Sequence, residues 1–122
     1  MKSSAVILLV EDEVLVQILI EDALADAGYD VRVACSGAEA MSFLDHCSET
    51  PLALVTDVDL GPPPSGWEIG RHAREVNPEM RILYMTGDSG DEWVAQGVAE
   101  SRLVLKPLEP THLVAAVAAL LA

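Results

Sequence analysis

The sequence predicts an α/β fold in which one parallel, doubly wound sheet of five strands carries helices on both faces. Three observations lead to this fold class. Apolar runs of strand length recur along the chain, and segments with helical spacing or helix start signals lie between them. The central run, 52–57, is apolar almost throughout, which is typical of a strand buried on both faces. It ends at Asp57, at the carboxyl end of a central strand, where open α/β sheets place their sites.

The first half of the chain predicts two strand–helix units. The first strand is an apolar run that ends abruptly at Glu11, and a polar stripe then recurs at helical spacing as far as Gly28, a left-handed helix cap. The second strand has alternating valines, and Ser36 with Glu39 predicts a capping box for the next helix. The expected strands are therefore 5–10 and 30–34, and the expected helices are 14–27 and 37–46.

The second half predicts three more strands and three more helices. Two further capping boxes, each a serine followed three residues later by a glutamate, start a helix at Ser65 and a short helix at Ser89. An Asn-Pro pair ends the first of these helices and Gly97 interrupts the second, while Pro110 starts the last helix. The expected strands are 52–57, 81–85 and 102–105. Right-handed crossovers then favour the strand order 2-1-3-4-5, the flavodoxin-like (βα)5 arrangement.

Length and composition bound the class of protein. The chain has 122 residues, 51% of them hydrophobic, so we expect one domain with its own core over 1–122 and no output domain. No apolar run approaches a membrane span, and no signal stretch opens the chain. The net charge of -13 argues against binding to nucleic acid or anionic membrane. Cys35 and Cys47 have no metal or redox spacing, which favours free thiols in the cytoplasm.

Polar residues follow four of the five predicted strands. They are Glu11-Asp12, Asp57, Thr86 and Lys106. Each has an ordinary structural explanation when it is taken alone: acids offset a helix dipole, an aspartate or a Thr-Gly pair forms a turn, and a lysine before proline is solvated. Because the carboxyl ends of parallel strands meet at one edge of the sheet, their occurrence together favours a shared site.

The chemistry of that site follows from the residue types. Glu11, Asp12 and Asp57 would repel one another, and a hard divalent cation with oxygen ligands, Mg2+, would relieve the repulsion. Asp57 can then act as a nucleophile toward phosphorus and form an aspartyl phosphate. Lys106 can reach the same group as a point charge, and the Thr86 hydroxyl can donate a hydrogen bond to a phosphoryl oxygen.

These motifs resemble the receiver domain of bacterial two-component response regulators. The resemblance is carried by four segments, which are Val10-Glu11-Asp12-Glu13, Val55-Thr56-Asp57, Met85-Thr86-Gly87 and Leu105-Lys106-Pro107. It implies that Asp57 is the phosphoacceptor and that Asp12, Asp57 and the backbone carbonyl of Asp59 bind Mg2+, with Glu11 holding a metal-bound water. It also implies that Thr86 and Lys106 grip the phosphoryl group, and that the Lys106-Pro107 bond is cis.

The resemblance also implies partners and a class of function. A histidine kinase or a histidine phosphotransfer domain would supply the phosphoryl group, and the chain would act as a signalling module rather than an enzyme, with phosphorylation and dephosphorylation only at Asp57. Many members dimerise or dock through the face formed by the fourth helix, the fifth strand and the fifth helix. Here Leu103 stands where the family often has a switching aromatic, and the fourth helix is short. Together with the Gly66-Trp67-Glu68 start of the third helix and the expected lack of an output domain, Leu103 makes the chain resemble stand-alone receivers or those of hybrid kinases.

Two other functions remain open at this point. Asp57-Val58-Asp59 with Thr86 and Lys106 is similar to haloacid-dehalogenase-type phosphatases, but that family's closing acidic pair follows the lysine, and only Glu109 does so here. A binding module that is never phosphorylated is the other alternative.

Two helices carry more apolar residues than one buried face requires. In the first helix, Val14, Leu15 and Ile18 lie next to the predicted site and could receive the phosphoryl donor. The last helix has no polar side chain over 113–122, and small residues such as Ala118 are expected to face outward. We therefore expect a homodimer or protein-target contact there, with Trp93 on the short fourth helix as a fluorescent reporter.

Overall fold

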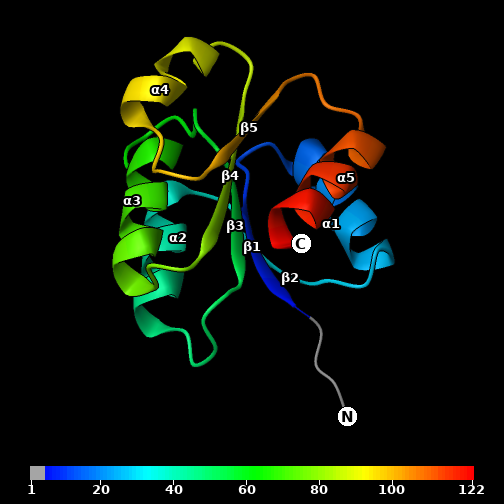
Figure 1. Ribbon diagram of the computed structural model, residues 1–122, viewed down its shortest axis with the longest axis horizontal. Helices are drawn as coiled ribbons and strands as arrows, with labels where there is room; N and C mark the ends of the chain where they lie inside the picture. Colours follow the sequence, from blue (N-terminus) through cyan, green and yellow to red (C-terminus); the bar gives the residue numbers. More distant parts are fainter. Residues whose placement is uncertain (1–4) are drawn as a thin grey trace.

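A five-stranded parallel sheet organises the structure, a computed structural model that describes residues 5–122. Its strands are β1 (Val6–Val10), β2 (Asp30–Ala34), β3 (Ala53–Asp57), β4 (Arg81–Thr86) and β5 (Arg102–Leu105). They lie in the order β2-β1-β3-β4-β5, which confirms the predicted flavodoxin-like sheet (Figure 1). Val10 of β1 lies opposite Thr56 of β3, so the residues that follow these two strands are brought side by side.

Helices cover both faces of the sheet (Figure 1). The helices are α1 (Val14–Asp26), α2 (Gly37–His46), α3 (Gly66–Val76), α4 (Trp93–Gln96) and α5 (Pro110–Leu121), and a 3-10 turn spans Gly90–Glu92. α1 and α5 lie on one face, while α2, α3 and α4 lie on the other (Figure 1). Within residues 5–122, no helix combines the length and the apolar character that a membrane crossing needs.

The core is therefore divided into two layers by the sheet. Alternate residues of β1 serve the two layers: Ile7 and Leu9 pack under α1 and α5, while Leu8 and Val10 pack under α2 and α3. All five residues of β1 and of β3 are buried. Because both faces of these strands are buried, their sequences are continuous apolar runs rather than an alternation of apolar and polar residues.

The predicted helix ends are confirmed in part. Gly28 follows α1 with a φ of 101°, a conformation that favours glycine, and the Ser65 capping box at the start of α3 is complete. At α2 only half of the box forms, because the Glu39 carboxylate accepts the backbone N–H of Cys35 at 2.8 Å. The capping box predicted at Ser89 is wrong. Its hydroxyl turns to a side chain from another loop, which is described below.

Candidate functional site

The carboxyl ends of the strands bring the predicted acids together. Asp57 ends β3, and Glu11 and Asp12 follow β1, so the pairing of these strands places all three at one edge of the sheet. One carboxylate oxygen from each lies within 4.8 Å of the others. Glu11 and Asp57 are buried, whereas Asp12 is exposed to solvent. The predicted convergence is therefore confirmed, and two of its three members are held inside the protein.

Lys106 is the cation of this acidic group. Its Nζ donates to Asp57 Oδ2 at 2.9 Å and to Glu11 Oε1 at 3.1 Å. The lysine follows β5, and its backbone N–H donates to the Thr86 carbonyl at 2.8 Å. This bond fixes the backbone position from which the lysine side chain extends. The Lys106–Pro107 peptide bond is cis, as the resemblance implies, and a second cis bond at Pro63–Pro64 was not predicted.

Glu11 is held through both of its carboxylate oxygens. Lys106 donates to Oε1, and the backbone N–H of Glu13 donates to Oε2 at 3.1 Å. The first turn after β1 therefore orients the carboxylate toward Asp57. Sequence patterns identified Glu11 as a site residue but gave no sign of its contact with Lys106, which lies 95 residues further along the chain.

Burial sets the direction of the pKa shift for the two buried acids but not for Lys106. It raises the pKa of Asp57, and the contacts with Lys106 only partly offset it. Burial also raises the pKa of Glu11, with the nearby charge of Asp57 as a further cause. For Lys106, burial acts to lower the pKa, but the hydrogen bonds and charges of Asp57 and Glu11 outweigh it and the pKa rises. The two buried acids thus carry negative charge at a cost in free energy.

The donor set fits a hard divalent cation. Three ionised carboxylates and one ammonium leave a local charge of about -2 by simple formal charges, and all the candidate ligand atoms are oxygens. One of the acids, Asp12, is exposed, so the group can be reached from solvent. A divalent cation would favour the charged form of both buried acids, whose pKa values are raised mainly by burial and further by the neighbouring carboxylates.

The backbone behind Asp57 is closely packed. The Gly66 N–H, at the start of α3, donates to the Val58 carbonyl at 2.9 Å. A Cβ at position 66 would collide with the carbonyl oxygen of Asp57, so only glycine lets α3 approach this closely. The proline-rich loop 62–64 therefore leads into a helix that starts against the backbone of Asp57, the predicted phosphoacceptor, and fixes the position of that backbone.

Thr86 lies at the same edge but makes a contact that the sequence did not predict. Its Oγ1 donates to Asp59 Oδ2 at 3.4 Å, and the Ser89 hydroxyl donates to the other oxygen of that carboxylate at 3.3 Å. The resemblance to receiver domains gave Asp59 a role only through its backbone carbonyl, and a side-chain role, as general acid/base, came only with the phosphatase alternative. Its place two residues after Asp57, beyond the end of the strand, is the one signal for a side-chain role.

The surface beside the acids is apolar. Four residues of α1 are exposed, Val14, Leu15, Ile18 and Leu19, and Leu15 is 82% exposed. A hollow of about 450 Å³, lined in part by Leu19, reaches Lys106 and Pro107. The prediction that α1 carries more apolar residues than its buried face needs is therefore confirmed, and the surplus lies next to the acidic group.

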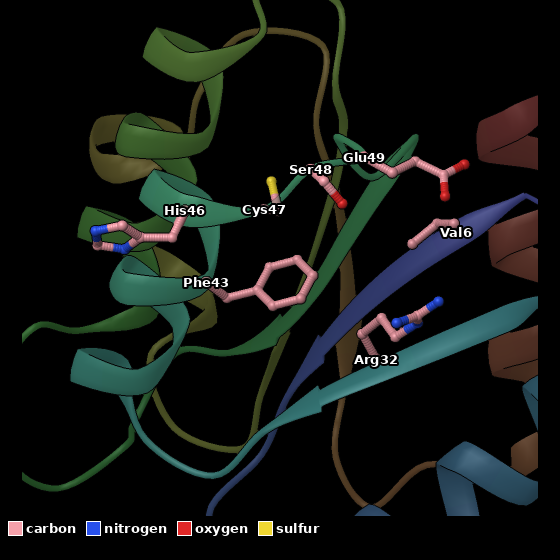
Figure 2. Close-up of a pocket in the computed structure, with 7 residues that line it drawn as sticks. All are labelled: Val6, Arg32, Phe43, His46, Cys47, Ser48 and Glu49. Carbon is pink, nitrogen blue, oxygen red and sulfur yellow. The ribbon is translucent and has the colours of Figure 1, made fainter.

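A separate hollow of about 280 Å³ lies at the opposite end of the sheet, by Val6 at the start of β1 (Figure 2). Phe43 projects toward Val6 and Arg32 there, whereas the His46 ring points away (Figure 2). The Arg32 guanidinium is already paired with Asp30 at 3.1 Å. The chemistry predicted from the sequence gathers at the acids instead, so we place the candidate site there.

Comparisons with known proteins show the family of the chain. A family model described as the response regulator receiver domain matches residues 7–118. A crystal structure of a response regulator receiver protein from Sinorhizobium medicae is 37% identical with a TM-score of 0.92, covering 97% of this chain and 94% of that one. The response regulator receiver protein CpdR of Brucella abortus is 35% identical over 81 residues. The sensor kinase CckA of the same species is 29% identical over 107 residues.

The extent of these matches differs among the relatives. The match to CpdR covers 66% of this chain and 65% of CpdR. The match to CckA covers 88% of this chain but only 11% of the kinase. The chain thus corresponds to one segment of the larger protein.

Proposed function

Since the chain belongs to the family of response regulator receiver domains, which act in two-component phosphorelay signalling, we propose that Asp57 is its phosphoacceptor. The observation that carries the proposal is the contact of Lys106 Nζ with Asp57 Oδ2 at 2.9 Å, beside two further acids within 4.8 Å. A buried carboxylate in contact with a lysine at a strand end places a nucleophile next to a cation that can bind the phosphoryl group after transfer.

The donor is a phosphohistidine of a kinase or a phosphotransfer domain. A carboxylate oxygen of Asp57 forms the new bond to phosphorus while the bond from phosphorus to the histidine nitrogen breaks. The leaving imidazole keeps the electron pair of that bond and takes a proton from solvent. Lys106 then donates a hydrogen bond to one oxygen of the phosphoryl group, and Thr86 donates to another. Both contacts stabilise the negative charge on the phosphoryl oxygens.

Mg2+ is the proposed cofactor of this transfer. Glu11, Asp12 and Asp57 would hold it together with the backbone carbonyl of Asp59, with Glu11 acting through a water. When bound, Mg2+ supplies positive charge that offsets the charge on the phosphoryl oxygens. The small, hard ion suits an all-oxygen donor set with room for water and phosphate.

The apolar surface of α1 is the proposed landing place of the donor. Leu15 and Ile18 are exposed one to two turns from Asp12. The hollow lined by Leu19 of the same helix is also lined by the acids Glu13 and Asp88. A helical partner with an apolar stripe and a basic rim would fit this surface in both hydrophobicity and charge. The proposal places the histidine of that partner over Asp57.

The phosphatase alternative is not supported, because the family match covers nearly the whole chain as a receiver domain. The arrangement of the acids agrees with this. Glu11 and Asp12 precede the nucleophile in the chain, and Glu109 heads α5 as its N-cap residue. We propose that the chemistry of this chain is limited to gaining and losing the phosphoryl group at Asp57.

The test is phosphorylation by acetyl phosphate with Mg2+, followed by intact-mass spectrometry. The parent should gain one acid-labile phosphoryl group, and Asp57→Asn should gain none. Asp26→Asn, which removes an exposed aspartate at the end of α1, is the matched control and should be labelled like the parent. Phosphate on Asp59, or labelling of Asp57→Asn, would overturn the assignment.

A further inference from the structure

The Asp59 carboxylate joins two loops at the rim of the acidic site. One oxygen accepts the Thr86 hydroxyl at 3.4 Å and the other accepts the Ser89 hydroxyl at 3.3 Å. The backbone N–H of Ser89 donates in turn to Thr86 Oγ1 at 2.9 Å. The three residues therefore form a closed network that ties the loop after β3 to the loop after β4.

The hydroxyl of Thr86 has one proton to donate. In this structure that proton goes to the Asp59 carboxylate, while the oxygen accepts the Ser89 N–H. An ionised carboxylate only accepts hydrogen bonds, so Asp59 cannot exchange roles with Thr86. A phosphoryl oxygen on Asp57 can therefore receive the Thr86 proton only after Thr86 has left Asp59.

Asp59 also contacts the predicted phosphoacceptor. Its backbone N–H donates to Asp57 Oδ1 at 3.3 Å, so one residue contacts both the site of phosphorylation and the group that must move in response. Its side-chain contacts are long for hydroxyl–carboxylate hydrogen bonds, and the residue is exposed to water. Both properties make the contacts weak enough for a phosphoryl group to displace them.

We propose that the Asp59 carboxylate is a positioning group that holds Thr86 and Ser89 in the unphosphorylated arrangement, in competition with a phosphoryl group on Asp57. This proposal rests on the proposed function of Asp57. A competing contact reduces the apparent affinity of the site for a phosphoryl mimic to the intrinsic affinity multiplied by the fraction of molecules in which Thr86 is free of Asp59. Removing the carboxylate should therefore strengthen the response, whereas the loss of an ordinary structural contact would weaken it.

The first measurement uses the full chain without metal or phosphoryl mimic. The side-chain torsion of Thr86 is read by NMR from its three-bond couplings, together with hydrogen exchange of the Ser89 amide. The parent should show one Thr86 rotamer. Asp59→Ala should average the rotamers and speed Ser89 exchange by about two- to tenfold. An unchanged Thr86 coupling in Asp59→Ala would overturn the proposal, whatever happens at Asp57.

The second measurement titrates beryllofluoride at saturating Mg2+. We expect Asp59→Ala to bind about three- to tenfold more tightly than the parent. Ser89→Ala, which removes one contact without changing charge, should gain about twofold, and Asp59→Asn, which keeps an acceptor oxygen, should fall between the parent and Asp59→Ala. Asp91→Ala removes an exposed acid two residues beyond Ser89 and controls for the loss of charge.

The two measurements separate this proposal from the proposed function. Equal or weaker beryllofluoride binding by Asp59→Ala, relative to Asp91→Ala, would overturn the competition. Failure of the parent to bind beryllofluoride would instead overturn the role of Asp57 and, with it, any competition at that site. In that case a changed Thr86 rotamer in Asp59→Ala would show only that the contact orders the loop.

Discussion

Asp12 differs from the other two acids of the site because its carboxylate is exposed to water. Its charge is one cause of the raised pKa of Asp57, so the two residues interact although no hydrogen bond joins them among the described contacts. An exposed acid next to two buried ones is the natural first ligand for an arriving cation, because it loses the least hydration.

We therefore predict that Asp12→Asn weakens Mg2+ binding by about tenfold or more, since one full charge is removed from a site of formal charge about -2. Titration followed by amide NMR shifts measures this directly. The matched control is Glu13→Gln, because Glu13 is also exposed and adjacent but its carboxylate is not among the three that converge. Equal affinity of Asp12→Asn and Glu13→Gln would contradict the site.

For single residues, the sequence predicts which side chains form the site better than it predicts which contacts those side chains make. Asp57 and Lys106 could be identified because each follows a short apolar strand, and parallel strands end at the same edge. The contact of Thr86 with Asp59 could not be predicted, because it depends on how the two loops turn after their strands end. Loop conformation is set by tertiary packing rather than by local pattern.

Among the secondary-structure elements, α4 is held in place by a chain of hydrogen bonds rather than by length. It has four residues. Its Trp93 donates to the Ser101 hydroxyl at 2.9 Å, that hydroxyl donates to the Val98 carbonyl at 2.7 Å, and the Val98 N–H donates to the Tyr84 hydroxyl at 3.1 Å. Tyr84 is buried in β4 opposite Leu103 of β5, where the resemblance would favour an aromatic. The aromatic whose hydroxyl holds the segment after α4 thus stands on the neighbouring strand.

Tyr84→Phe removes the acceptor of the Val98 N–H, and we expect it to destabilise the protein by about 1–2 kcal/mol, as a partly buried donor loses its partner. It should also reduce the change in Trp93 fluorescence on beryllofluoride binding. The measurement is made with Trp67→Phe throughout, because Trp67 lies 4.6 Å from the Tyr84 ring and would mask the signal. Tyr29→Phe is the control, and an unaltered Trp93 response in Tyr84→Phe would rule out this route.

The exposed surface of α1 gives a second prediction for an element. Leu15→Glu should slow transfer from a phosphohistidine protein by about tenfold or more, because it places a charge at the centre of an apolar contact. Labelling by acetyl phosphate should remain as in the parent, since that small donor does not need the surface. Val94→Glu, at a position that is 91% exposed on α4, is the control. Equal slowing by both variants would contradict a specific docking role for α1.

A predicted capping box is confirmed where the serine side chain bonds within its own helix start, and it is wrong where the serine bonds to a distant loop. The Ser65 box is local, since both of its hydrogen bonds lie within four residues, and it was predicted correctly. The same pattern at Ser89 was wrong because Asp59, 30 residues earlier, takes the serine hydroxyl. An equally good local pattern was thus overridden by a contact that only the fold creates.

For the molecule as a whole, we predict that assembly with a second copy or a target protein uses α5. Leu113, Val117 and Leu120 are buried as predicted, and Ala115 and Ala118 face outward. Ala118→Glu should weaken self-association or target binding, because small side chains allow close helix approach and a glutamate does not. Sedimentation velocity of the phosphorylated protein and a pull-down with the target measure this. Ala38→Glu on α2 is the control, and unchanged association of Ala118→Glu would exclude α5.

The contact between Lys106 and Glu11 joins residues 95 positions apart, and the contact with Asp57 spans 49. During synthesis on the ribosome, the first four strands emerge before the lysine does, so a nascent chain already has its acids but lacks their cation. Only docking of β5 at the edge of the sheet completes the pocket. If Asp57 accepts a phosphoryl group as proposed, its ability to hold that group depends on β5 having docked, so phosphorylation also reports that the sheet is complete.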